Sequence, residues 1–309
     1  PFVLKEIEAT REKDPQKALR DFDRAFFGHI AFTLSNVARV LWMGMTGARL
    51  TAVPGGAPEL KHYYQQLTRL SSGFALTADV AMFLCGGSLK RRERLSARLG
   101  DVLSQLYLAS AVLKRYEDDG RPQADLPLVR WGLLDCLYRI EESFYSIFEN
   151  LPWPVVSWFL RGLIFPLLMP YGREFAPPRD PLGHEVVGLM MTPGPTRDRR
   201  TRGVFISGNE DDPVRTLESA LVAVIAAEPV EAKLRQAQQA GRISRGHAGQ
   251  MAAEGLKAGV ITQTEADLLK RAAELRRKVI MVDDFPKDFG KSEIHQTTQP
   301  VTFEALARK

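Results

Sequence analysis

Five histidines, two cysteines and a pair of adjacent glutamates are the residues of this sequence best suited to catalysis or metal binding. The histidines are far apart, and none has a second ligand or a nucleophile at motif spacing: His29, His62, His184, His247 and His295. Each is therefore expected to be structural or exposed. The sequence also lacks the patterns GxSxG, GxGxxG, GxxxxGK(S/T) and HExxH. No hydrolase nucleophile, dinucleotide fingerprint, P-loop or zinc-protease site is predicted, and no catalytic residue is assigned.

Glu141 and Glu142 follow Arg139 within an apolar helical pattern. A row of ion pairs on a helix surface explains these residues more simply than acid–base chemistry does. The two cysteines, Cys85 and Cys136, lie in apolar helical patterns without CxxC or histidine spacing. We therefore expect buried free thiols, a reducing compartment and no metal site.

Two clusters of basic residues are candidates for binding anions. They consist of Lys90, Arg91, Arg92, Arg94 and Arg98, and of Arg197, Arg199, Arg200 and Arg202. Cations at a helix N-terminus oppose its dipole, so a carboxylate or a phosphate-bearing partner is expected near the first cluster. Solvated basic surfaces are the simpler interpretation of both clusters. The net charge of +5 suits nucleic acid, but no stacking platform or reading helix accompanies it, and no nucleic-acid partner is expected.

The apolar periodicity that must position these residues is helical along most of the chain. With 309 residues, 45% hydrophobic and 26% charged, the chain is long enough for one elaborate or two modest globular domains. Apolar residues three and four apart predict helices over 2–13, 16–45, 58–85, 88–116 and 126–150. Ser88 and Asp125 are the expected N-caps of the last two helices. Four long helices with short connections predict an antiparallel bundle over residues 1–150.

The most apolar stretch is LPWPVVSWFLRGLIFPLLMPYG, at 151–172. It barely reaches the roughly 20 residues that a bilayer requires, Arg161 stands at its centre, and prolines interrupt it. We therefore predict that residues 151–175 lie in a membrane surface or dock against another protein layer. The candidate membrane-contact residues are Trp153, Trp158, Phe159, Arg161, Ile164 and Phe165. The end of the second helix, Trp42 to Leu50, is the alternative.

Residues 176–309 predict a smaller helical subdomain with an extended tail. A Pro- and Gly-rich loop is expected first, with a short strand at Val204–Ile206. Helices are then predicted over Pro213–Ala227, Pro229–Gln239, Ser244–Lys257 and Gln263–Val279. Thr262 and Glu265 have the spacing of a capping box at the start of the last helix. The whole pattern predicts an all-α fold.

A resemblance to a known family rests on two segments. The stretch SLKRRERLSARLGDVLSQLYLASAVLKRY, within Gly86–Asp135, and the later VDDF at 282–285 resemble the C-terminal region of the bacterial-type long-chain acyl-CoA dehydrogenase of fatty-acid β-oxidation. The likeness begins at PFVLKEIEA, so it covers nearly the whole chain. The 29-residue stretch that begins at Ser88 is highly specific for this family.

The resemblance implies a flavoenzyme that contains FAD, oxidises acyl-CoA to trans-2-enoyl-CoA and uses a glutamate as its base. No VEGAN-like segment with that glutamate occurs here, so the base is expected upstream of Pro1, and this chain alone is expected neither to bind FAD nor to be active. The implied partners are upstream dehydrogenase domains, acyl-CoA through the parent enzyme, a membrane surface and further copies in a homo-oligomer. The expected location is the cytoplasm, with peripheral attachment to the inner membrane as a variant. The alternative is an autonomous membrane-associated helical scaffold without enzymatic activity.

Overall fold

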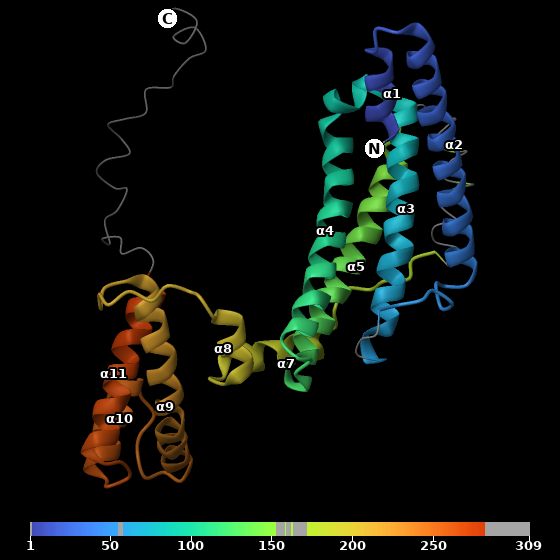
Figure 1. Cartoon of the computed structure of the whole chain (residues 1–309). Helices are drawn as coiled ribbons and strands as arrows, with labels where there is room; N and C mark the ends of the chain where they lie inside the picture. Colours follow the sequence, from blue (N-terminus) through green and yellow to red (C-terminus); the bar gives the residue numbers. More distant parts are fainter. Residues whose placement is uncertain (1, 55–57, 153–157, 159–161, 163–171, 282–309) are drawn as a thin grey trace, which may run out of the picture. The chain divides into compact units, whose positions relative to one another are not determined.

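The computed structural model describes residues 2–54, 58–152, 158, 162 and 172–281 (Figure 1). These residues form ten α-helices and no strand, which confirms the predicted all-α fold class. The chain divides into two compact units, Pro1–Thr192 and Pro193–Lys309. Each unit is described separately. The three-part division at residues 150 and 175 stays a prediction.

The first unit is built on four long helices that run alternately up and down (Figure 1). They are α2 (Pro15–Met45), α3 (Lys61–Cys85), α4 (Glu93–Asp118) and α5 (Leu126–Glu149). The short helix α1 (Phe2–Thr10) packs on α2, and α7 (Asp180–Met191) packs on α5. The core contains Leu70, Tyr116, Leu133, Phe144 and Phe148, all fully buried. Burial of each large apolar side chain contributes about 1.5–3 kcal/mol, so these inward faces hold the bundle together.

The helix starts differ in part from those predicted. Asp14 caps α2, because its carboxylate accepts the N–H of Gln16 at 3.0 Å. Ser88 was predicted to cap the fourth helix, but its hydroxyl donates to the carbonyl of Cys85 at 2.6 Å. The 3₁₀ turn η2 (Gly86–Arg91) precedes α4, which begins at Glu93. Asp125 stands at the N-cap position of α5, but its side chain forms no capping hydrogen bond.

Two buried glutamines of α3 fix the connection from α2. The amide of Gln65 donates to the carbonyl of Arg49 at 2.9 Å, and that of Gln66 donates to the carbonyl of Gly47 at 3.1 Å. The connection turns through positive φ values of 57° at Gly47 and 58° at the buried Ala48. These hydrogen bonds offset part of the cost of burying the two amide groups.

The second unit contains α8 (Pro195–Thr201), α9 (Pro213–Gln239), α10 (Ala248–Lys257) and α11 (Gln263–Ile280). Helices α9, α10 and α11 pack around a small core that includes Val230, Leu234 and Ile261. The predicted capping box is confirmed, since the side chains of Thr262 and Glu265 each bond the other's backbone N–H.

Three expectations for residues 176–239 are wrong. The predicted loop after residue 176 contains α7 and α8, because Pro181 and Pro195 occupy first helical turns, where a missing N–H costs nothing. No strand forms at Val204–Ile206. The predicted break at Pro229 is absent, and α9 continues through it. An interior proline costs about 3 kcal/mol, which burial of the following Val230 and Leu234 offsets.

Candidate functional site

The residues that could do chemistry do not gather into a catalytic cluster in the described part of the chain. No group of three or more His, Cys, Asp or Glu residues there could hold a metal ion. His29 contacts Glu6 at 3.1 Å and stacks on Phe2, so its role is structural. Cys85 and Cys136 are buried free thiols, as predicted. Burial raises the pKa of the Cys136 thiol to about 11, which keeps it protonated and unreactive.

The strongest polar arrangement is a buried ion pair between α3 and the segment before α7. Arg69 is fully buried, and its guanidinium donates to both carboxylate oxygens of Glu174, at 3.2 and 2.7 Å. The guanidinium also lies 5.9 Å from the ring centroid of Phe175. A bidentate pair of this kind has a fixed geometry. Arg69 therefore fixes the position at which residues 174 and 175 cross α3.

Glu141 of α5 completes this network and is not the surface residue that the sequence suggested. Its side chain is 1% exposed and accepts the backbone N–H groups of Glu174 and Phe175, at 2.8 and 3.0 Å. Burial raises the pKa of Glu141 above its ordinary value, although the two N–H bonds act in the opposite direction. The predicted ion-pair row is also wrong for Arg139, which pairs with Asp135, one turn earlier.

Glu142, the neighbour of Glu141, forms a more exposed contact with the same segment before α7. It pairs with Arg173 at 2.6 Å, and the Arg173 guanidinium lies 4.8 Å from the ring centroid of Tyr145. Residues 173–175, which we call the return anchor, thus contact α5 close to where that helix ends at Glu149. The return anchor therefore binds the same helix whose C-terminal end leads into the apolar stretch 151–172.

A cavity of about 440 Å³ lies beside the return anchor. Its walls come from α3, α5, α7 and the segment before α7, and include His62, Leu134, Phe175, Arg179 and Leu182. Burial, reinforced by the positive charge of Arg69, lowers the pKa of His62. The imidazole is therefore held neutral over a wider pH range than usual.

The network contains two residues that the sequence analysis missed, Arg69 and Glu174. Arg69 had a usable signal, since it lies between the apolar positions Leu67 and Leu70 of a helix. A buried arginine requires a carboxylate partner. No local pattern identifies Glu174 as that partner, because it lies 105 residues further along the chain.

Of the candidate membrane-contact residues, only Trp158 is among the described residues, and its side chain is 77% exposed. Trp153, Phe159, Arg161, Ile164 and Phe165 lie outside them. The alternative at the end of α2 has exposed side chains at Trp42, Met45 and Leu50.

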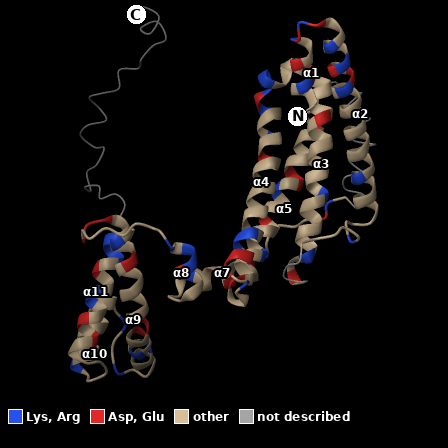
Figure 2. Ribbon diagram, in the orientation of Figure 1, with Lys and Arg blue, Asp and Glu red and all other residues tan. Residues whose placement is uncertain are grey.

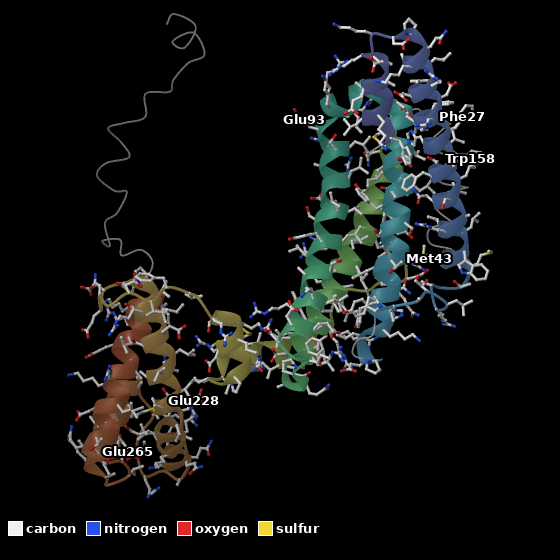
Figure 3. The ribbon with its side chains drawn as sticks, in the orientation of Figure 1. Phe27, Met43, Glu93, Trp158, Glu228 and Glu265 are labelled. Atoms are coloured by element: carbon white, nitrogen blue, oxygen red, sulfur yellow. The ribbon has the colours of Figure 1, made fainter. Side chains whose placement is uncertain are left out.

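A longer apolar surface continues along α2 from this end toward the start of the chain. Phe27 and Leu34 are both 64% exposed, and Ile30 is 41% exposed. Helix α2 forms one edge of the bundle, and Figure 3 shows Phe27 on this helix. Between Ala25 and Met45, Arg39 is the only lysine, arginine or acidic residue, and Figure 2 shows most of this part of α2 without charge. So much uncharged surface on one helix indicates an interface.

The basic clusters show no built phosphate site. Lys90, Arg91, Arg92 and Arg94 are exposed around η2 and the start of α4, and no described carboxylate forms an ion pair with them. Glu93, in the first turn of α4, is an acidic residue beside this cluster. In the second cluster, Arg197 pairs with Glu218 of α9.

Helix α3 is part of the one described stretch, Pro58–Arg91, with the length and apolar composition to cross a membrane. One third of its most apolar window is buried. The same helix also buries Gln65, Gln66 and Arg69, each with a hydrogen-bond partner inside the unit. These contacts make α3 a core helix of the bundle.

A cavity of about 810 Å³ lies between α9, α10 and α11. Its floor is apolar, and three of the cations around it already pair with glutamates: Arg235 and Arg276 with Glu231, and Lys270 with Glu274. A flavin dinucleotide needs a pocket for its ring and donors for its pyrophosphate. Because three of its cations are paired with glutamates, this cavity does not offer the set of free donors that a flavin pyrophosphate requires.

Comparison with known families matches residues 1–285 to the family described as acyl-CoA dehydrogenase, C-terminal, bacterial type. No solved structure matches the chain. The match spans the whole first unit and most of the second. It includes the stretches at 86–135 and 282–285 on which the resemblance rests. The chain therefore belongs to the bacterial-type acyl-CoA dehydrogenase C-terminal family.

Proposed function

We propose that this chain is the C-terminal region of an FAD-dependent acyl-CoA dehydrogenase, the enzyme that converts acyl-CoA to trans-2-enoyl-CoA in the first step of fatty-acid β-oxidation. The family match over residues 1–285 supports this proposal. FAD, acyl-CoA and the catalytic glutamate belong to domains upstream of Pro1. This chain contributes structural and oligomer contacts in the cytoplasm, and its own residues hold the helical body together.

Measurement of flavin content and activity tests the proposal. The parent enzyme should carry FAD in stoichiometric amount and oxidise palmitoyl-CoA with an artificial electron acceptor. The 309-residue chain alone should do neither, because the proposal assigns the flavin site and the catalytic glutamate to the upstream domains. Stoichiometric FAD binding and palmitoyl-CoA oxidation by the isolated chain would overturn the proposal.

A second function is peripheral attachment to the inner membrane, favoured by the exposed Trp158. Tryptophan suits the headgroup boundary of a bilayer, and nearby cations attract anionic lipid. Flotation with anionic liposomes should carry the wild-type chain upward and leave the Trp158→Asp/Phe165→Asp double variant behind. Equal flotation of both proteins would exclude this stretch as the anchor.

A further inference from the structure

The cavity of about 810 Å³ in the second unit exists because short side chains face one another across it. The residues that leave this space unfilled are small: Ala248, Gly249, Ala252 and Ala253 of α10, and Ala266 and Ala273 of α11. The cavity follows α11 from Gln263 to Arg277, a length of about 21 Å at a rise of 1.5 Å per residue. It is therefore long enough to receive an extended chain.

The floor of this cavity is apolar. Leu234 of α9 is buried, and Met251, Leu256 and Leu269 are partly buried in the same cluster. Release of water from a surface of this kind favours binding of an apolar chain. A cavity with an apolar lining and a few polar groups at fixed positions is typical of a small-molecule site.

Positive charge is in excess at one end of the cavity. Arg277 has no ion-pair partner among the described residues, and it follows Ala266 by about three helical turns on the same face of α11. Two further arginines, Arg235 and Arg276, share the single carboxylate of Glu231, at 3.7 and 3.2 Å. An anionic group at this end would therefore meet cations that the protein's own carboxylates do not fully balance.

The other carboxylates that line the cavity already have partners. Glu274 lies 4.0 Å from Lys270, and Asp267 accepts the side-chain N–H of Gln263 at 3.0 Å. Asp267 and Gln263 stand near the start of α11, at the end of the cavity away from Arg277. The cavity thus has a polarity along its length, with an apolar floor between.

We propose that this cavity binds a single-chain amphiphile with one carboxylate head, a free fatty acid. Its alkyl chain lies over Leu256 and Leu269, and its carboxylate accepts hydrogen bonds from the guanidinium of Arg277. An uncharged chain would leave Arg277 without a partner, and a cationic head would be repelled there. Only residues of the second unit carry this inference, which does not rest on the proposed function.

Isothermal titration of the 309-residue chain with dodecanoate, kept below its micelle concentration, tests the proposal. We expect saturable binding of one dodecanoate per chain. Dodecyltrimethylammonium has the same alkyl chain and a cationic head, and it should bind at least about tenfold more weakly.

Two variants locate the site, and each has a matched control in a second cavity of about 400 Å³ between α9 and α11. Ala273→Trp fills the proposed site, and Ala226→Trp places the same side chain in the other cavity. Both alanines are exposed, so neither change overpacks a core. Ala273→Trp should weaken dodecanoate binding at least about tenfold, and Ala226→Trp should leave it unchanged.

The head-group contact has its own pair of variants. Arg277→Gln should weaken dodecanoate binding about tenfold and leave the binding of uncharged dodecanol unchanged. Arg271→Gln removes a cation of the second cavity and should change neither affinity. Circular dichroism should show the wild-type melting temperature for all four variants.

Several results would overturn the proposal. The wild-type chain would then show no saturable binding, or Ala273→Trp and Ala226→Trp would weaken binding equally. Equal affinity for the carboxylate and the ammonium head would show that the cavity does not select an anion. Binding that appears only after removal of residues 282–309 would show that this segment occupies the cavity in place of a fatty acid.

Discussion

The buried ion pair between Arg69 and Glu174 shows how a residue's partner decides its role. A charged side chain inside a bundle normally opposes folding, and here the bidentate geometry and the neighbouring Phe175 compensate for the lost water. The Nε atom of Arg69 still has no hydrogen-bond partner among the described residues. The pair therefore sets the position of the return anchor more than it adds to stability.

We expect Glu174→Gln to destabilise the first unit more than Arg69→Met does. Glu174→Gln leaves the guanidinium of Arg69, 1% exposed, without its carboxylate, and such an uncompensated charge costs about 3–5 kcal/mol. Arg69→Met leaves Glu174, which is 19% exposed and can be hydrated. Denaturant unfolding measures both losses, and the double variant should recover part of the larger one. Equal losses in the single variants would contradict this account.

The carboxyl of Glu141 should make the stability of the bundle fall as pH rises. Burial raises its pKa, so the folded protein keeps the proton at pH values where the unfolded chain has released it. The free energy of unfolding therefore decreases from the ordinary carboxyl pKa up through the raised one. Glu141→Gln has no proton to lose, so the wild-type stability minus that of the variant should decrease over this window. Unfolding curves at a series of pH values check the sign, and a flat difference would refute it.

Periodicity alone could not have placed these residues. Glu141 was expected at the surface because it follows Arg139 and precedes Glu142, whereas its partners are backbone groups 33 and 34 residues away. The spacing of residues along a helix does not show which distant segment will pack on a given face. The buried state of Cys85 and Cys136 was predictable, because the residues around each cysteine are themselves apolar.

At the scale of the elements, the sequence predicted the long helices well and the proline-rich region poorly. The apolar spacing located α2, α3, α4 and α5, since burial and helix geometry produce the same pattern. Between residues 176 and 203 the prolines predict a loop, although Pro181 and Pro195 stand in first helical turns; Pro229 predicts the start of a new helix, although it lies inside α9. Helix propensity gives the free-energy cost of a proline inside a helix, but tertiary packing determines whether the folded structure compensates for that cost.

The contact of α10 with α9 depends on the missing side chain of Gly255. A Cβ there would lie 2.3 Å from Cδ2 of the buried Leu234. Gly255→Ala should therefore destabilise the second unit by about 1–3 kcal/mol through overpacking. Gly249→Ala, on the same helix, is the matched control, because its Cβ would come no closer than 3.5 Å to His247. Thermal unfolding compares the two variants, and an equal effect would contradict the tight approach at Gly255.

For the whole molecule, the main feature is that each unit has its own core. The large cluster around Leu70 and Phe144 belongs to the first unit, and the clusters around Leu234 and Ala227 belong to the second. The boundary at Thr192–Pro193 lies within the Pro- and Gly-rich stretch that begins at residue 176, and the helix α7 in this stretch packs on α5 of the first unit.

We expect the two units to unfold in separate transitions. The four tryptophans, at positions 42, 131, 153 and 158, all precede residue 193, so tryptophan fluorescence reports the first unit alone. Circular dichroism reports the helices of both units. Glu174→Gln should shift the fluorescence transition, whereas Gly255→Ala should shift only the part of the dichroism curve that fluorescence does not follow. A single transition common to both probes would show one cooperative block.

The return anchor has a consequence for a chain that is cut. Leu151 is buried at the end of α5, and residues 173–175 are held on the same helix by Glu141 and Glu142. If the chain is divided at a position between residues 152 and 172, the two pieces should therefore associate without a peptide bond between them. Expressed together from separate genes, they should co-purify through one affinity tag, and Glu174→Gln in the second piece should weaken that reassembly.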